Sequence, residues 1–109
     1  MNTNEQRLQI AEVHMKDAMQ RVISDGTRAA AAFDAGYTWL LVALNAPTGG
    51  AHPGVEAIRN GINQLDVGPE KMTAALAFLK RQYSPEGVED LLDELLDWAQ
   101  MMKKLAGVA

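Results

Sequence analysis

Apolar residues recur at three- and four-residue steps along nearly the whole chain, and this spacing is the feature that most restricts its fold. The sequence contains no run of alternating β-branched residues that would favour a strand. A length of 109 residues is close to the commonest size of a single domain. The pattern therefore predicts one all-α domain over residues 1–109.

Glycine, proline and capping residues divide this pattern into five expected helices. The three long helices cover about 4–24, 28–45 and 85–106, and the two short ones cover about 53–65 and the stretch beginning at Pro69. The helix over 28–45 is apolar nearly all round, which predicts a place in the middle of the bundle. The first helix is expected to keep Val22 on its apolar face and to end at Gly26, which can take the left-handed cap conformation.

Composition excludes several classes of function. Because the chain has no cysteine, it has neither disulfides nor thiolate metal sites. A net charge of −4 disfavours general attraction to nucleic acid or to anionic membranes. The polar N-terminus does not resemble a secretory signal, and the apolar stretch 29–46 is short and interrupted by Asp34, which favours a buried helix over a membrane span. A soluble cytoplasmic protein is therefore expected.

Residues able to do acid–base chemistry are few. The two histidines are His14, at the edge of the first helix's apolar face, and His52, in a loop rich in glycine and proline. Four carboxylates of the last helix are spaced as helical i, i+4 pairs, but no Glu-x-x-His pattern accompanies them, so a solvated acidic face is the preferred interpretation. The four carboxylates are Glu89, Asp90, Asp93 and Glu94. We expect neither a metal nor a cofactor.

One segment resembles a known family. The stretch from Arg28 to Asn45 resembles the second helix of HEPN-like domains, in which an aromatic-Asp-x-Ala-Tyr pattern opens a long apolar helix. The residue-by-residue likeness is carried by Phe33 to Tyr37 and by the loop that holds His52. The order of long and short helices also agrees with that family. The resemblance implies a five-helix HEPN-like bundle.

The catalytic motif of the ribonuclease members of that family is incomplete in this chain. Those members carry an arginine, usually a polar residue, and then a histidine four to six positions later near the last long helix. Arg81 and Gln82 begin such a motif, but no histidine follows them. Arg81 alone could stabilise charge at a phosphate without supplying a proton acceptor. Arg7 and His14 have the spacing of the motif, yet they lie in the first helix, and we interpret this spacing as coincidence.

The preferred hypothesis is a non-catalytic HEPN-like interaction module. The resemblance implies a homodimer or a complex with a nucleotidyltransferase or a toxin–antitoxin-type protein. Physically, Trp39, Trp98 and the pair Met101-Met102 suggest more apolar surface than one monomer can bury.

Two alternatives remain open. The first is a metal-independent HEPN-type endoribonuclease with a divergent site, for which the candidate catalytic residues are Arg81, Asp34 and His52; RNA is an expected partner only in this case. The second is a phage- or plasmid-type structural protein with no site. Under the preferred hypothesis, Asp34 pairs with Arg28 or Arg81 as a buried polar anchor.

Overall fold

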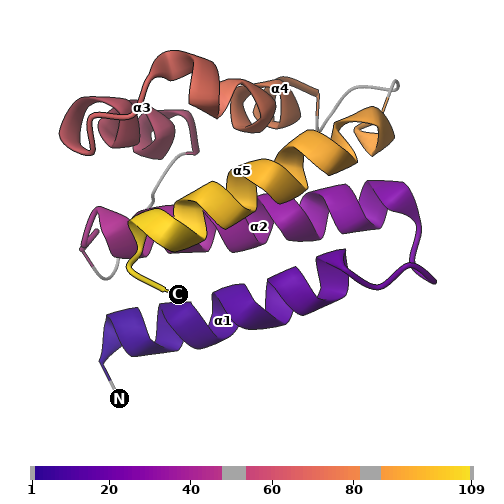
Figure 1. Ribbon diagram of the computed structural model, residues 1–109, viewed down its shortest axis with the longest axis horizontal. Helices are drawn as coiled ribbons and strands as arrows, with labels where there is room; N and C mark the ends of the chain where they lie inside the picture. The colour runs from indigo at the N-terminus through magenta and orange to yellow at the C-terminus, as the bar shows by residue number, and fades with distance from the viewer. Residues whose placement is uncertain (1, 48–53, 82–86, 109) are drawn as a thin grey trace.

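A computed structural model describes residues 2–47, 54–81 and 87–108 (Figure 1). Over these ranges the chain forms helices and no strands, which confirms the all-α prediction. The five α-helices are accompanied by two short 3₁₀ turns that lead into α4 and α5. The elements are α1 (Thr3–Ala18), α2 (Asp25–Ala43), α3 (Gly54–Gln64), η1 (Pro69–Met72), α4 (Thr73–Arg81), η2 (Glu89–Leu91) and α5 (Leu92–Leu105).

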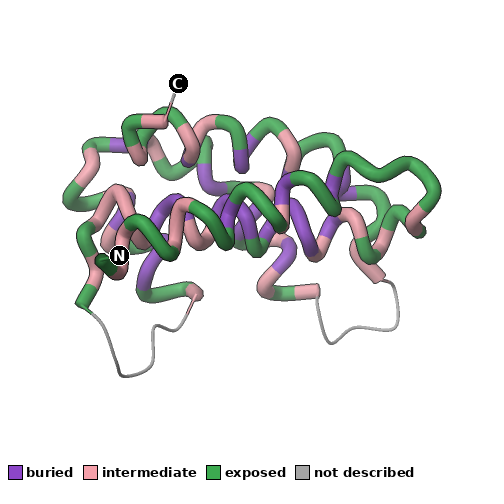
Figure 2. The backbone as a smooth tube through the Cα atoms, turned by 90° about the horizontal axis from the view of Figure 1, so that it is seen from below, coloured by how far each residue is buried: buried purple, intermediate pink, exposed green. Residues whose placement is uncertain are grey.

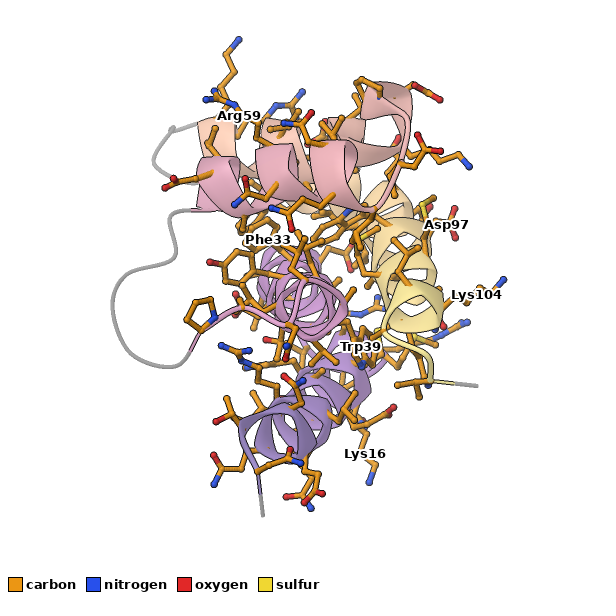
Figure 3. The ribbon with its side chains drawn as sticks, turned by 90° about the vertical axis from the view of Figure 1, so that its left-hand side faces the viewer. Lys16, Phe33, Trp39, Arg59, Asp97 and Lys104 are labelled. Carbon is orange, nitrogen blue, oxygen red and sulfur yellow. The ribbon has the colours of Figure 1, made fainter. Side chains whose placement is uncertain are left out.

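The helices form three layers, with α2 in the middle layer as the sequence predicts. In Figure 1, α2 and α5 lie side by side, α1 runs beneath them, and α3 with α4 lies above. The end-on view in Figure 3 shows the same order, with Trp39 at the level where α1, α2 and α5 meet. A helix that is apolar on most sides suits this position, because neighbours cover it from several directions.

Small residues bring α2 close to its neighbours. Ala29, Ala32 and Ala35 have no exposed surface, and Gly36 faces Trp98 of α5 so closely that an added Cβ would lie 2.3 Å from the indole carbon Cζ3. Alanine and glycine remove the side-chain bulk that normally separates helix axes. On the side that faces α4, the ring of Phe33 stacks on Phe78 with centroids 4.4 Å apart. The packing of α2 thus changes from small residues on one side to large rings on the other.

Buried positions follow the central helices, as Figure 2 shows. Trp39 and Met102 have no exposed surface, and Trp98 is 2% exposed. The expectation that the tryptophans and methionines form an apolar surplus for a dimer is therefore wrong for these three residues, because one chain buries them itself. The large apolar residues that are exposed are Ile10, Val13, Met19, Val22, Val55, Leu76 and Leu105.

The first helix ends six residues before the predicted Ser24. Ser24 is instead the N-cap of α2, where its Oγ accepts a hydrogen bond from the backbone N–H of Thr27. Because an N-cap residue has extended and not helical backbone, α1 must end before Ser24. Gly26 consequently lies in the first turn of α2 rather than capping α1, and Val22 is 94% exposed in the connection instead of on an apolar face.

The last α-helix begins later than predicted. Gly87 has a φ of +77°, in the left-handed region, so the helix does not run through it. Glu89 and Asp90 form a 3₁₀ turn, and α5 starts at Leu92. The predicted cap at Ser84 and Pro85 lies outside the described residues. Acidic residues in the first turn of α5 and two lysines in its last turn still oppose the helix dipole.

No helix among the described residues is long and apolar enough to cross a membrane.

Candidate functional site

A groove runs between α4 and α5. It encloses about 470 Å³ and is lined on one side by η1 and α4 and on the other by η2 and α5. The α4 side presents Ala74 and Ala77, spaced one helical turn apart. Since their methyl groups reach only a short way, they leave the space between the two helices unfilled. The hollow is therefore a direct consequence of alanine at these two positions.

The floor of the groove is apolar. Leu91, Trp98 and Met101 line it from the α5 side, at spacings that place them on one stripe of the helix. The N–H of the Trp98 indole points away from solvent and donates to Sδ of Met72 at 3.2 Å. Because this hydrogen bond holds the ring in place, the floor of the groove is rigid at its centre.

Charged side chains form the rim. Glu94 and Asp97 of α5 and Glu70 and Lys71 of η1 all line the groove and are all exposed. Carboxylates thus flank the apolar floor from both sides, with one lysine between them. Such a layout is typical of a surface that binds a partner with an apolar stripe bordered by charge.

Arg81, a predicted site residue, lies at the C-terminal end of α4 and lines one end of the groove. Its guanidinium donates to both carboxylate oxygens of Asp90, at 2.9 Å and 2.7 Å. The hydrogen bond and charge of Arg81 lower the pKa of the Asp90 carboxyl below its ordinary value. A single guanidinium nitrogen, Nη1, makes both hydrogen bonds, and the contact compensates the charge of Arg81. It thereby ties the end of α4 to η2 across the segment that leads into α5.

Asp34, the second predicted site residue, is not a buried anchor. It is exposed on α2, and the charged group that influences it is His14 of α1. Partial desolvation between the two helices raises the pKa of the Asp34 carboxyl, and the nearby His14 lowers it by a smaller amount. The predicted pairing of Asp34 with Arg28 is wrong, because Arg28 donates from Nε to the carbonyl of Ala18 at 2.9 Å and contacts Asp25.

His52, the third predicted site residue, lies outside the described residues. The other histidine, His14, is half-buried on α1, near enough to Asp34 of α2 for its charge to influence the Asp34 carboxyl. Arg81 pairs with Asp90 of η2. Of the predicted site residues, Arg81 is thus held by Asp90, and Asp34 is influenced by the charge of His14.

Arg7 has a structural role that explains its place in the first helix. Its guanidinium donates to the carbonyls of Ala46 at 2.8 Å and Pro47 at 3.2 Å, just beyond the end of α2. Its charge also partly offsets the effect of burial, which raises the pKa of the Tyr37 hydroxyl. Because the guanidinium binds the backbone that follows α2, the interpretation of the Arg7 and His14 spacing as coincidence agrees with the contacts.

The acidic residues of the last two elements do not form a metal centre. Within residues 2–47, 54–81 and 87–108, no three histidine or carboxylate side chains are placed to hold a metal ion. Asp90 is occupied by Arg81, while Glu89, Asp93 and Glu94 are exposed. They form the solvated acidic face that the sequence predicts.

Comparison with known proteins yields no relative. No protein-family model matches the chain, no curated protein matches it significantly, and no solved structure does so. The resemblance to HEPN-like domains therefore stays a prediction.

Sequence reasoning missed the groove. The signal was present, since Ala74 and Ala77 lie one turn apart in a helix whose other positions carry large apolar residues. Spacing alone cannot tell a hollow from a close helix–helix contact, because alanine permits both.

Proposed function

We propose that this chain is a non-catalytic helical interaction module, HEPN-like in architecture, that binds a protein partner through the groove between α4 and α5. The observation that carries the proposal is the groove itself, which has a volume of about 470 Å³, an apolar floor and a border of exposed charges. An apolar centre with a polar rim is the layout of protein–protein interfaces. An apolar floor contributes binding free energy in proportion to the area it removes from water.

The contacts of the predicted catalytic residues support binding over catalysis. Metal-independent cleavage of RNA needs a proton acceptor and a charge stabiliser at the same phosphate. The guanidinium of Arg81 donates from Nη1 to both carboxylate oxygens of Asp90, whereas Asp34 lies on α2, where the charge of His14 on α1 influences its carboxyl. This arrangement favours a structural role for Arg81 at the end of the groove.

Site-specific photo-crosslinking tests the proposal. A photoreactive residue replaces Thr73, which is exposed on the groove rim, in cells that produce the chain. The matched position is Gln9, which is exposed on α1, on the far side of the middle layer (Figure 1). We expect one discrete crosslinked product from position 73 and none from position 9. The product should disappear when Ala77→Arg fills the groove.

Two results would overturn the proposal. A product that forms equally from both positions, or that survives Ala77→Arg, would show that the groove is not the binding surface. Cleavage of RNA by the purified chain in EDTA, lost in Arg81→Ala but not in Arg59→Ala, would instead support the endoribonuclease alternative. Sedimentation of the purified chain across concentration shows whether the crosslinked partner is a second copy.

A further inference from the structure

We infer that the groove takes a basic amphipathic helix from a partner protein, about three turns long, with its apolar stripe on the floor and its cationic side chains on the carboxylate rim. This inference rests on the proposed function and adds the chemistry of the partner. It follows from the length, floor and charge of the groove.

The length of the groove suits a short helix. On the α5 side it extends from Leu91 to Met101, which at 1.5 Å per helical residue is about 15 Å. A partner helix of three turns spans about the same distance. Its apolar residues at every third or fourth position would meet the floor at successive turns.

The floor can receive large side chains because the α4 wall is shallow. Ala74 and Ala77 contribute one methyl group each, and the indole of Trp98 lies opposite them on the floor. Leucine or methionine side chains from a partner would fill the space that larger residues on α4 would otherwise occupy. The charged rim residues would then exclude water from the edges of the contact.

The rim selects a basic partner. Three carboxylates, those of Glu70, Glu94 and Asp97, line the groove, and Asp90 already compensates the charge of Arg81. Lys71 is the remaining cation among the groove residues. The net field along the rim is thus negative. Complementary charge raises the association rate and discriminates against acidic partners, and both effects weaken with salt.

A second copy of the chain fits the groove poorly. The chain carries a net charge of −4. The part of α1 that exposes Ile10 and Val13 carries the exposed Glu12 and Asp17 besides Lys16, so its charge is not net positive. A separate chain with an arginine- or lysine-rich amphipathic helix is the better match.

Tryptophan fluorescence supplies the test. The chain has two tryptophans, so Trp39→Phe leaves Trp98, on the groove floor, as the only indole. The probe is a synthetic helical peptide of roughly 14 residues, long enough to cover the groove, with leucine at three- and four-residue steps and arginine on both flanks. Its counterpart carries glutamate in place of every arginine. Anisotropy of the labelled peptides on the unchanged chain repeats the titration without any substitution.

We expect the arginine peptide to shift the Trp98 emission and to bind at least tenfold more tightly than the glutamate peptide at low salt. The double variant Glu94→Gln, Asp97→Asn should weaken binding of the arginine peptide about fivefold, which is ~1 kcal/mol by the affinity relation. The control Glu5→Gln, Asp17→Asn removes two exposed carboxylates from α1 and should leave it unchanged. Ala77→Arg should abolish binding, whereas Gln9→Arg, which adds the same charge on α1, should not.

Equal binding of the two peptides, or tighter binding of the glutamate peptide, would overturn the inference on charge while leaving a binding groove in place. Binding of neither peptide, with the crosslinked product from position 73 still formed, would also overturn it and leave the proposed function standing. If neither peptide binds and no crosslinked product forms from position 73, the inference and the proposed function are both overturned.

Discussion

The two faces of the middle layer are covered in different ways. On one face α1 lies against α2 along much of its length, through small residues such as Ala11 and Ala18, which have no exposed surface. On the other face α3, η1 and α4 make fewer contacts and rely on a few large side chains, among them Ile58, Met72 and Phe78. The first face is closed along its length, whereas the second leaves the groove between α4 and α5.

The difference teaches how this small bundle combines stability with an open site. Small residues allow close approach, so a substitution there meets rigid neighbours. Large side chains at wider spacing can shift slightly, and where alanines replace them a hollow remains. The tryptophans show the same contrast. Trp98 donates its N–H to Met72 beside the groove, whereas Nε1 of the buried Trp39 has no partner among the described residues, and Lys103 lies over its ring at 5.5 Å.

The largest expected effect comes from adding one methyl group at a rigid contact. Gly36→Ala would place Cβ 2.3 Å from Cζ3 of Trp98, an indole held by its stacking on Phe33. Overpacking of this kind costs about 3 kcal/mol, against a gain of ~1 kcal/mol in helix propensity. We expect the free energy of unfolding to fall by about 2 kcal/mol in urea titrations.

Gly61→Ala, on α3, is the matched control. Its added Cβ would lie 2.9 Å from Cδ1 of Leu40 and 3.2 Å from Cε of Met72, both at the ends of flexible side chains. The same gain in helix propensity should offset a small adjustment, so the net change should stay within about 1 kcal/mol. Equal losses from the two alanines would contradict the distinction between a contact with a fixed ring and a contact with flexible side-chain ends.

A smaller effect is expected where arginines hold the antiparallel pair of α1 and α2. Arg7 donates to the carbonyls beyond the end of α2, and Arg28 donates to the carbonyl of Ala18 at the end of α1. Arg7→Met keeps the aliphatic part and removes these donors, which should cost about 1 kcal/mol in urea titrations. The exposed Arg59 on α3 serves as control, and Arg59→Met should change the stability little. A neutral Arg7→Met would mean that solvent satisfies the carbonyls of Ala46 and Pro47 equally well.

The smallest expected effect concerns Asp34 and depends on pH. Its folded-state pKa is raised, first by desolvation, so the ionised carboxylate destabilises the fold above that pKa, and the penalty is lost as pH falls through it. Asp34→Asn should therefore stabilise the chain at pH 7 by roughly a few tenths of a kcal/mol, since solvent screens this exposed group.

The gain from Asp34→Asn should vanish below the ordinary carboxyl pKa of 3.8, where Asp34 is protonated in both states. Urea titrations at pH 7 and at an acidic pH check this, with Asp17→Asn on the exposed side of α1 as the control. A gain that persists unchanged in acid would show that desolvation of the carboxylate is not its source.

Much of the fold was predictable because it depends on local spacing. The helical stripes predict every α-helix and the central place of α2. The boundaries were less predictable. Ser24, Asp25, Gly26 and Thr27 can all cap or end a helix, and their local preferences do not decide between the end of α1 and the start of α2. Gly87 likewise delays α5 through a left-handed backbone that its neighbours do not reveal.

The sites were less predictable than the helices. Sequence reasoning singled out Arg81, which does line the groove, but it expected the Asp34 carboxylate to meet an arginine. The partner of a charged side chain depends on the rotation of each helix, and a rotation of one residue moves a side chain by about 100°. Spacing along one helix contains no information on the helix opposite.

The sequence by itself determined the fold class, the succession of helices and the acidic start of the last helical segment, because helix periodicity and charge placement are local properties. Only the tertiary structure decided that both tryptophans are buried in one chain, that Arg7 binds the backbone that follows α2, and that Ala74 and Ala77 face α5 across a hollow. These outcomes depend on how far apart two helices lie and which faces they turn to each other. That distance is set by the whole set of contacting side chains, since cores pack to a common density that no single segment specifies.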